Sequence, residues 1–330
     1  MPRCSHPKCR VADTGVCLEG HKQGCPNLLP DEPTTVSGSG EPRTALPETR
    51  RFHSGEKLTI HECSRMLNEK PARVVFCAGS QESGKTTFLA RIGEMFRDGS
   101  FSRYRFAGSR TLCGFERATW LATIASGAGR PATKRTRRVE NDTFLHLTVH
   151  PADEPTNHLE LLISDLAGET FPTAVASREF CEGLHSLARA DHLVTFMDCA
   201  RLGDSVSRHA ERDNARAFLQ RVTSVKHDHE VLHVQVAFSR WDYALRHANP
   251  EAQQKYLAEI QEDLQQRFGS SFATLEFLRI AARPDDGIHR TDADIQAMLA
   301  RWIEMRAPTL KHSAQRCQNP ARDFSAFGLT

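Results

Sequence analysis

The segment Gly79–Thr86 constrains the fold more than any other part of the sequence. It reads Gly-Ser-Gln-Glu-Ser-Gly-Lys-Thr and lies between an apolar run and a helical pattern. Residues 73–78 predict a buried strand that enters this octet, and residues 85–96 predict a helix that leaves it. Glycines in such a loop let backbone N–H groups converge on phosphate, and the positive end of the helix adds to the attraction. The pattern predicts a phosphate-binding loop rather than an accidental Gly-rich turn.

Each position of the octet has an expected part in binding a nucleoside triphosphate. Lys85 would reach the β- and γ-phosphates and so act in catalysis, while the hydroxyl of Thr86 would ligate Mg²⁺. The remaining expected contacts come from Gly79, Ser80, Gln81, Glu82, Ser83, Gly84 and Thr87.

Apolar runs alternate with longer helical patterns along residues 70–306, which is typical of β-α units. The runs predict strands at 73–78, 144–149, 159–165, 192–198, 231–238 and 275–281. Helical periodicity predicts helices at 85–96, 205–225, 251–268 and 292–305, the second with a buried stripe that includes Val206 and Phe218. This order predicts an α/β fold with a doubly wound, mainly parallel sheet and helices on both faces.

The predicted strand at 159–165 ends in an acidic residue of the kind that positions magnesium. Asp165 would hold the metal, usually through water. Gly168, three residues later, would donate its N–H to the γ-phosphate and sense its presence. The alternative is an ordinary strand followed by an Asp–Gly turn.

The strand at 231–238 delivers polar residues at its end, where α/β sheets bind ligands. Asp242 would accept hydrogen bonds from the N1–H and exocyclic amine of guanine. The stem of Arg240, next to Ser239, could lie over the base plane. After the last strand, Ala281, Ala282 and Arg283 could offer backbone N–H groups to the guanine O6. These residues favour guanine over adenine.

Together these segments resemble the G1 to G5 motifs of P-loop GTPases of the translation-factor-related class, over roughly residues 70–305. The matching segments are Gly79–Thr86 for G1, Asp165–Gly168 for G3, Ser239–Asp242 for G4 and Ala281–Arg283 for G5. The resemblance implies a G-domain fold and a GTP-hydrolysing molecular switch. Ser239 and Arg240 stand where the family has Asn or Thr and then Lys, and Ala281 replaces the usual Ser. An ATP-using P-loop enzyme therefore remains the alternative.

The resemblance also implies a first switch and a water-orienting side chain. Family members place a Mg²⁺-ligating threonine in the first switch, and Thr111 is the expected residue, with Thr119, Thr133 and Thr136 as rivals. Gln often follows the G3 glycine, whereas Glu169 stands here. Its carboxylate could accept a hydrogen bond from the attacking water but adds charge near phosphate. Slow or partner-dependent turnover is expected, and a catalytically weak nucleotide-binding scaffold is the alternative.

The first 28 residues form a Cys-rich segment with too few large apolar side chains for a core. Cys4, Cys9, Cys17 and Cys25 could close one tetrahedral Zn²⁺ site, with a ligand set that includes His21 and incidental or redox cysteines as alternatives. Residues 29–69 are predicted to be a linker, 70–306 the GTPase domain and 307–330 a tail.

The narrower resemblance is to bacterial double-GTPase and GTPase-associated proteins of conflict or defence systems, because a Cys-rich head accompanies a long segment between G1 and G3. It implies a protein partner, an effector or a second GTPase. A formal net charge of +2 predicts no nucleic-acid partner. No run approaches the ~18 apolar residues of a membrane span, so we expect a cytoplasmic protein without one.

Overall fold

The computed structural model describes residues 3–5, 28–29, 53–99, 101, 103–120, 143–284 and 291–304. The chain forms two compact units, Met1–Arg51 and Phe52–Thr330. In the smaller unit, β1 (Arg3–Cys4) pairs antiparallel with β2 (Leu28–Leu29). Cys9, Cys17 and Cys25 lie outside the described residues, so the zinc site stays a prediction. Within the described ranges, no group of three or more His, Cys, Asp or Glu side chains could hold a metal.

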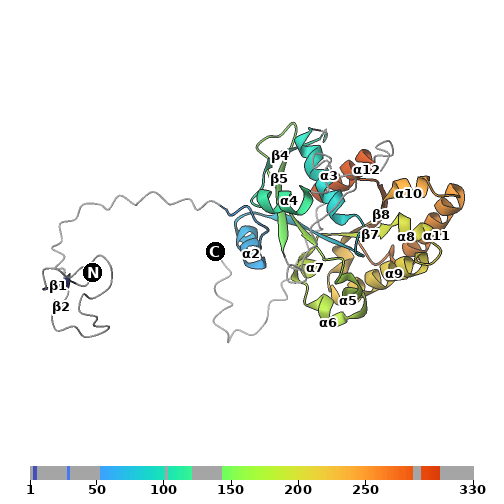
Figure 1. The fold of residues 1–330 in the computed structure, drawn as a ribbon, viewed down its shortest axis with the longest axis horizontal. Coiled ribbons are helices and arrows are strands. Elements are labelled where there is room, and N and C mark those ends of the chain that lie inside the picture. The colour runs from blue at the N-terminus through green and yellow to red at the C-terminus, as the bar shows by residue number, and fades with distance from the viewer. Residues whose placement is uncertain are drawn as a thin grey trace, which may run out of the picture. The chain divides into compact units, whose positions relative to one another are not determined.

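The larger unit is built on a seven-stranded sheet in the order β4-β5-β6-β3-β7-β8-β9 (Figure 1). The strands are β3 (Ala72–Gly79), β4 (Tyr104–Gly108), β5 (Phe144–Pro151), β6 (Leu159–Asp165), β7 (His192–Asp198), β8 (His233–Ser239) and β9 (Thr274–Ile280). The pairings of β3 with β6 and β7, of β7 with β8 and of β8 with β9 are parallel. The pairings of β4 with β5 and of β5 with β6 are antiparallel. The predicted α/β fold with a mainly parallel sheet is therefore confirmed, with an antiparallel edge.

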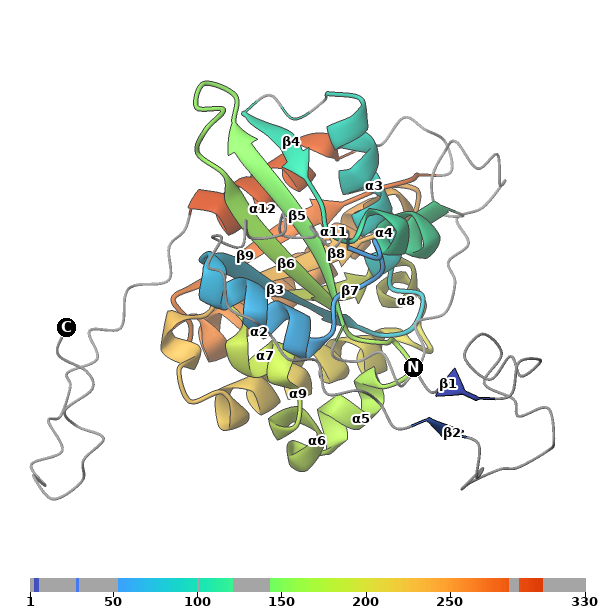
Figure 2. The ribbon, with the colours of Figure 1, turned by 90° about the vertical axis from the view of Figure 1, so that its left-hand side faces the viewer.

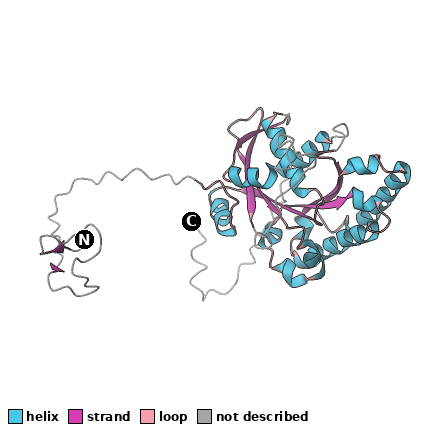
Figure 3. Ribbon diagram, viewed as in Figure 1, coloured by secondary structure: helices cyan, strands magenta, loops and turns pink. Residues whose placement is uncertain are grey.

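Helices cover both faces of this sheet (Figures 2 and 3). The longer ones are α3 (Lys85–Arg97), α9 (Arg208–Val225), α11 (Pro250–Phe268) and α12 (Asp292–Glu304). The shorter ones are α4 (Leu112–Thr119), α5 (Phe171–Ala176), α6 (Arg178–Glu182), α7 (His185–Arg189), α8 (Cys199–Gly203) and α10 (Trp241–Leu245). Of the helices that the structure describes, none combines the length and apolar character that crossing a bilayer requires.

Alternate residues of the central strand β3 face opposite cores, as the pleat of a strand dictates. Val75 and Cys77 pack with residues of α3 and α12, such as Phe88 and Trp302. Phe76 and Ala78 pack with residues of α9 and α11 on the other face. The strand is apolar throughout because both of its faces are buried.

One helix lies inside the region predicted to be a linker. The helix α2 (Ile60–Glu69) begins with a capping box, in which Thr59 and Glu62 hydrogen-bond to each other's backbone N–H. Its buried Cys63 and Met66 pack in a cluster with Val74 of β3. The larger unit therefore starts at Phe52 rather than at residue 70.

Candidate functional site

The octet connects β3 to α3 through a tight turn of the backbone. Glu82 has φ of 63° and Gly84 has φ of 86°, both in the left-handed region. Glycine adopts this conformation freely, whereas a non-glycine residue does so at a cost of order 1 kcal/mol. The first helical hydrogen bond of α3 runs from the N–H of Phe88 to the carbonyl of Gly84. The turn thus places the start of the helix directly at the loop.

Lys85 is held inside the loop that precedes it. Its Nζ atom donates to the carbonyl oxygens of Gly79 and Ser80 at 2.9 and 3.1 Å and to Oγ of Ser83 at 3.4 Å. Burial lowers the pKa of Lys85, and the charge of Asp165 opposes this shift. The ammonium group is therefore kept at the phosphate loop by the loop's own oxygens.

Asp165 ends β6 beside the strand that enters the loop, in register with Cys77 of β3. Its Oδ1 atom is buried and has no hydrogen-bond partner within the described part of the chain. Burial raises the pKa of Asp165, and the charge of Lys85 opposes the rise. A buried carboxylate oxygen without a partner fits a cation site, because Mg²⁺ binds carboxylate oxygens.

Gly168 lies against the backbone of the phosphate loop. A Cβ atom built on it would stand 2.5 Å from Cα and 2.8 Å from N of Gln81, closer than real Cβ contacts. Only glycine fits between the two segments, which places the turn after β6 directly at the loop. Glu169, the next residue, is exposed.

The ends of β8 and β9 approach the loop from the other side. A Cβ on Gly84 would lie 3.6 Å from Cβ of Ser239, whose hydroxyl donates to the carbonyl of Met197. Asp242 is 3% exposed and accepts a hydrogen bond from Arg246. After β9, the N–H of Ala281 donates to the hydroxyl of Thr291, so Ala281 does not offer it to a base.

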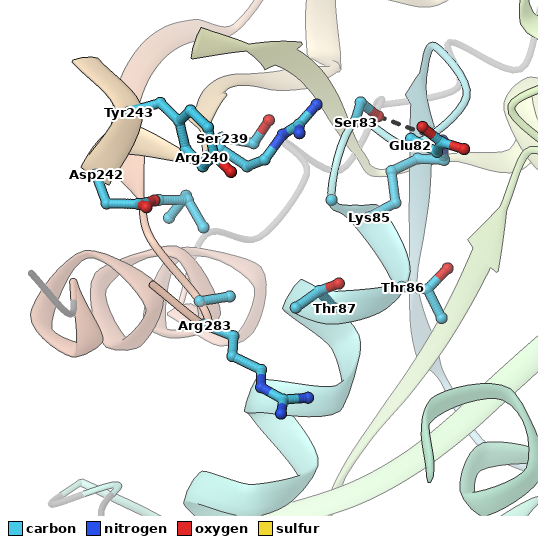
Figure 4. Close-up of a pocket in the computed structure, with 13 residues that line it drawn as sticks. Glu82, Ser83, Lys85, Thr86, Thr87, Ser239, Arg240, Asp242, Tyr243 and Arg283 are labelled. Carbon is cyan, nitrogen blue, oxygen red and sulfur yellow. Dashed lines mark hydrogen bonds between the residues drawn. The ribbon is translucent and has the colours of Figure 1, made fainter. Parts of the chain in front are cut away.

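These segments enclose a pocket of about 410 Å³ (Figure 4). Thr86 and Thr87 lie at the first turn of α3, and Ser239, Arg240 and Asp242 lie across the pocket from them. The lining residues are Glu82, Ser83, Gly84, Lys85, Thr86, Thr87, Ser239, Arg240, Asp242, Tyr243, Ile280, Ala282 and Arg283. Tyr243 and Ile280, which no sequence pattern indicated, line the pocket beside the predicted residues. Gly79, Ser80, Gln81, Asp165, Gly168 and Glu169 do not line this pocket.

The structure does not bring Thr111 to the pocket. Thr111 is fully buried at the start of α4, and its hydroxyl accepts the N–H of His146 at 2.8 Å. The imidazole of His146 accepts the N–H of Arg110 at 2.9 Å, so the segment after β4 is fastened to β5. Among the rivals, Thr119 donates to the carbonyl of Phe115 within α4. Thr133 and Thr136 lie outside the described residues.

A set of charged residues that the sequence analysis missed lies next to the loop. Glu211 of α9 is 6% exposed and accepts a hydrogen bond from Ser80. Arg201 of α8 donates to the carbonyl of Gln81 at 2.8 Å. Burial raises the pKa of Glu211, and the N–H of Asp198 that it accepts opposes the rise. One signal in the sequence could have indicated Glu211: it is an acidic residue on the apolar stripe of a predicted helix, four residues before Ala215.

Comparison with known proteins identifies one matching family. Residues 73–303 match the family model described as Double-GTPase 2. No curated protein matches the chain.

Three solved structures are similar to the chain at low sequence identity. The signal recognition particle receptor SRb-GTP/SRX complex from Chaetomium thermophilum is 14% identical, with a TM-score of 0.37, over 69% of this chain and 98% of that chain. The Ski7 GTPase-like domain of S. cerevisiae, bound to GDP and inorganic phosphate, is 13% identical with a TM-score of 0.37, over 67% of this chain and 45% of that chain. Sup35 complexed with GMPPNP is 14% identical with a TM-score of 0.35, over 77% of this chain and 51% of that chain.

Proposed function

The chain belongs to the Double-GTPase 2 family, and from this premise we propose that it binds GTP in the pocket above Gly79–Thr86 and hydrolyses it as a molecular switch. The observation that carries the proposal is the convergence of the loop, the Ser239–Asp242 segment and Ala282 around one pocket. The phosphates would bind at the loop and the base at the far end.

The triphosphate end would be bound by charge and by backbone. Lys85 is already held at the loop and would exchange loop carbonyls for phosphate oxygens. Thr86 and Asp165 would hold Mg²⁺, for which Oδ1 of Asp165 is suited, because it is buried and has no hydrogen-bond partner among the residues that the structure describes. The metal ion would neutralise charge on the phosphates. Gly168, pressed against Gln81, would report the presence of the γ-phosphate to the segment that follows it.

The base end would distinguish guanine from adenine by hydrogen bonding. The carboxylate of Asp242 accepts hydrogen bonds, as recognition of the guanine N1–H and amine requires. Tyr243 and Arg240 lie beside it, with the guanidinium 5.6 Å from the centre of the tyrosine ring. Ala282 would serve the guanine O6 through its backbone, because Ala281 already donates to Thr291.

Hydrolysis would depend on Glu169 and on a partner. The exposed carboxylate of Glu169 follows the glycine at the loop and would orient water, but its charge opposes approach to the γ-phosphate. We therefore propose slow intrinsic turnover and stimulation by a protein partner, an effector or a second GTPase. A place in a bacterial defence system, and a zinc site in residues 1–28, belong to the same proposal.

Steady-state phosphate release with GTP and Mg²⁺ tests the enzymatic part of the proposal. We expect release by the full-length protein and its loss in Lys85→Ala, with Lys255→Ala of α11 as a matched surface control that keeps the wild-type rate. Equal background release by the wild type and Lys85→Ala, together with tight GTP binding by the wild type, would instead identify a nucleotide-binding scaffold.

A further inference from the structure

A chain of polar contacts with two buried carboxylates joins the phosphate loop to the segment that precedes Asp242. Oγ of Ser80 lies 3.2 and 3.1 Å from the two carboxylate oxygens of Glu211 and donates to them. Glu211 also accepts the N–H of Asp198 at 3.0 Å. The carboxylate of Asp198, at the end of β7, accepts a hydrogen bond from the guanidinium of Arg240. The chain therefore runs from the loop through α9 and β7 to the Ser239–Asp242 segment.

Arg201 connects the same groups a second time. Its Nη2 donates to the carbonyl of Gln81 at 2.8 Å. Its other nitrogens lie 3.6 Å from Asp198 and 3.6 Å from Glu211. Two carboxylates thus face two guanidinium groups, and both acids are buried, with Asp198 at 0% and Glu211 at 6% exposure.

Removal of one member of a buried charge network forces the others to find new partners, because an unpaired buried charge is costly. Without the Glu211 carboxylate, Arg201 would have Asp198 as its one acidic partner in this network. Asp198 would then be shared between Arg201 and Arg240. Arg240 adopts a left-handed backbone conformation, with φ of 50°, two residues before Asp242. The contact of its guanidinium with Asp198 therefore fastens the segment that carries Asp242 to the end of β7.

We propose that Glu211 is a positioning residue that couples the phosphate loop to the Ser239–Asp242 segment, so that the two ends of the nucleotide are bound cooperatively. Glu211 acts through Ser80 on one side and through Asp198, Arg201 and Arg240 on the other. This inference rests on the proposed function, since it concerns the same nucleotide pocket.

The test is a mutant cycle on GTP affinity with the full-length protein, measured by calorimetry. Wild type, Ser80→Ala, Arg240→Ala and the double variant give the coupling between the two ends. We expect the effects to be non-additive by about threefold or more, as for residues of one network. In the Glu211→Gln background, which has the same side-chain length but one acceptor oxygen and no charge, the same four measurements should become additive within about twofold.

A residue that only stabilised the fold would lower thermal stability and leave the coupling unchanged. Glu160→Gln is the matched control, because Glu160 is also a buried carboxylate, hydrogen-bonded to His146 at 2.8 Å away from the pocket. It should lower stability and preserve the coupling. If Glu211→Gln does not fold, Arg201→Ala replaces it, since Arg201 is partly exposed and its loss should also remove the coupling.

Coupling that persists in folded Glu211→Gln, or in Arg201→Ala where that variant has to replace it, would overturn the inference while GTP binding itself stands. Additivity already in the wild-type background would overturn it as well. Failure of the wild-type protein to bind GTP would overturn the proposed function and this inference with it. Loss of coupling in Glu211→Gln, or in Arg201→Ala where Glu211→Gln does not fold, with coupling kept in Glu160→Gln, would support the inference.

Discussion

Asp242 lines the pocket beside the phosphate loop, and its carboxylate accepts a hydrogen bond from Arg246 one helical turn later. The guanidinium of Arg246 pairs with this carboxylate at a site where only 3% of Asp242 is exposed. A carboxylate at this position, with two acceptor oxygens, suits a base that presents two hydrogen-bond donors.

Asp242→Asn should reverse the preference for the base. The amide offers donors, which match the C2 carbonyl of xanthine and not the amine of guanine. Loss of charge-assisted hydrogen bonds corresponds to about 1.5–3 kcal/mol, or roughly ten- to a hundred-fold weaker GTP binding. Competition between GTP and xanthosine triphosphate measures the ratio. Arg246→Gln, which leaves the carboxylate of Asp242 in place, should keep the preference for GTP. An unchanged ratio in Asp242→Asn would mean that Asp242 does not face the base.

Gly168→Ala should weaken GTP binding by tenfold or more, because the added methyl group would press on the backbone of Gln81. The matched control is Gly183→Ala, where the nearest atom to a new Cβ is 3.5 Å away and φ is −76°. Calorimetry with GTP on both variants checks this. Wild-type affinity in Gly168→Ala would show that the contact opens without cost when nucleotide binds.

Thr86→Ala and Thr111→Ala should distinguish a threonine that binds magnesium from one that stabilises the fold. Thr86→Ala should raise the Mg²⁺ concentration that half-saturates GTP binding by about tenfold. Thr111→Ala should leave that concentration unchanged and lower the free energy of unfolding by about 1–2 kcal/mol, because the N–H of His146 loses its acceptor. Magnesium titration and urea unfolding measure the two effects. A Mg²⁺ defect in Thr111→Ala would restore the role that its sequence position predicts.

The imidazole of His192 should make the fold sensitive to acid. Burial, together with the neighbouring charges of His233 and Arg73, lowers the pKa of His192 to about 3. Because the unfolded chain takes up this proton near pH 6.5 and the folded chain near pH 3, stability is lost as the pH falls through that interval. At pH 5 the loss relative to pH 7 is about 2 kcal/mol.

Urea unfolding of wild type and His192→Leu at both pH values isolates this contribution from the other titrating groups. The variant should lose about 2 kcal/mol less than the wild type between pH 7 and pH 5. Equal losses in the two proteins would contradict the assignment to His192.

Strands buried on both faces could be predicted from the sequence, because each is a continuous apolar run. The run at 159–165 and the run at 192–198 coincide with β6 and β7. The edge strand β4 could not be predicted, since Arg105, Phe106 and Ala107 are exposed and no apolar run marks it. Helix α2 was missed for a similar reason, because its buried side chains are few.

Val206, predicted on the buried stripe of the helix at 205–225, is 87% exposed, because α9 begins at Arg208.

Contacts between distant segments account for what the sequence could not predict about the site. Thr111 lies where family spacing suggests a switch, yet its hydroxyl is taken by β5. Glu211 reaches Ser80 across 131 positions of sequence, a relationship that no local pattern encodes.

Competition between GTP and ATP for the wild-type protein tests the central claim most directly. With Mg²⁺ present and a fluorescent GTP analogue as the displaced probe, we predict that GTP competes at least a hundredfold better than ATP, because Asp242 pairs with the N1–H and amine that adenine does not present together. Equal or better competition by ATP would contradict the account.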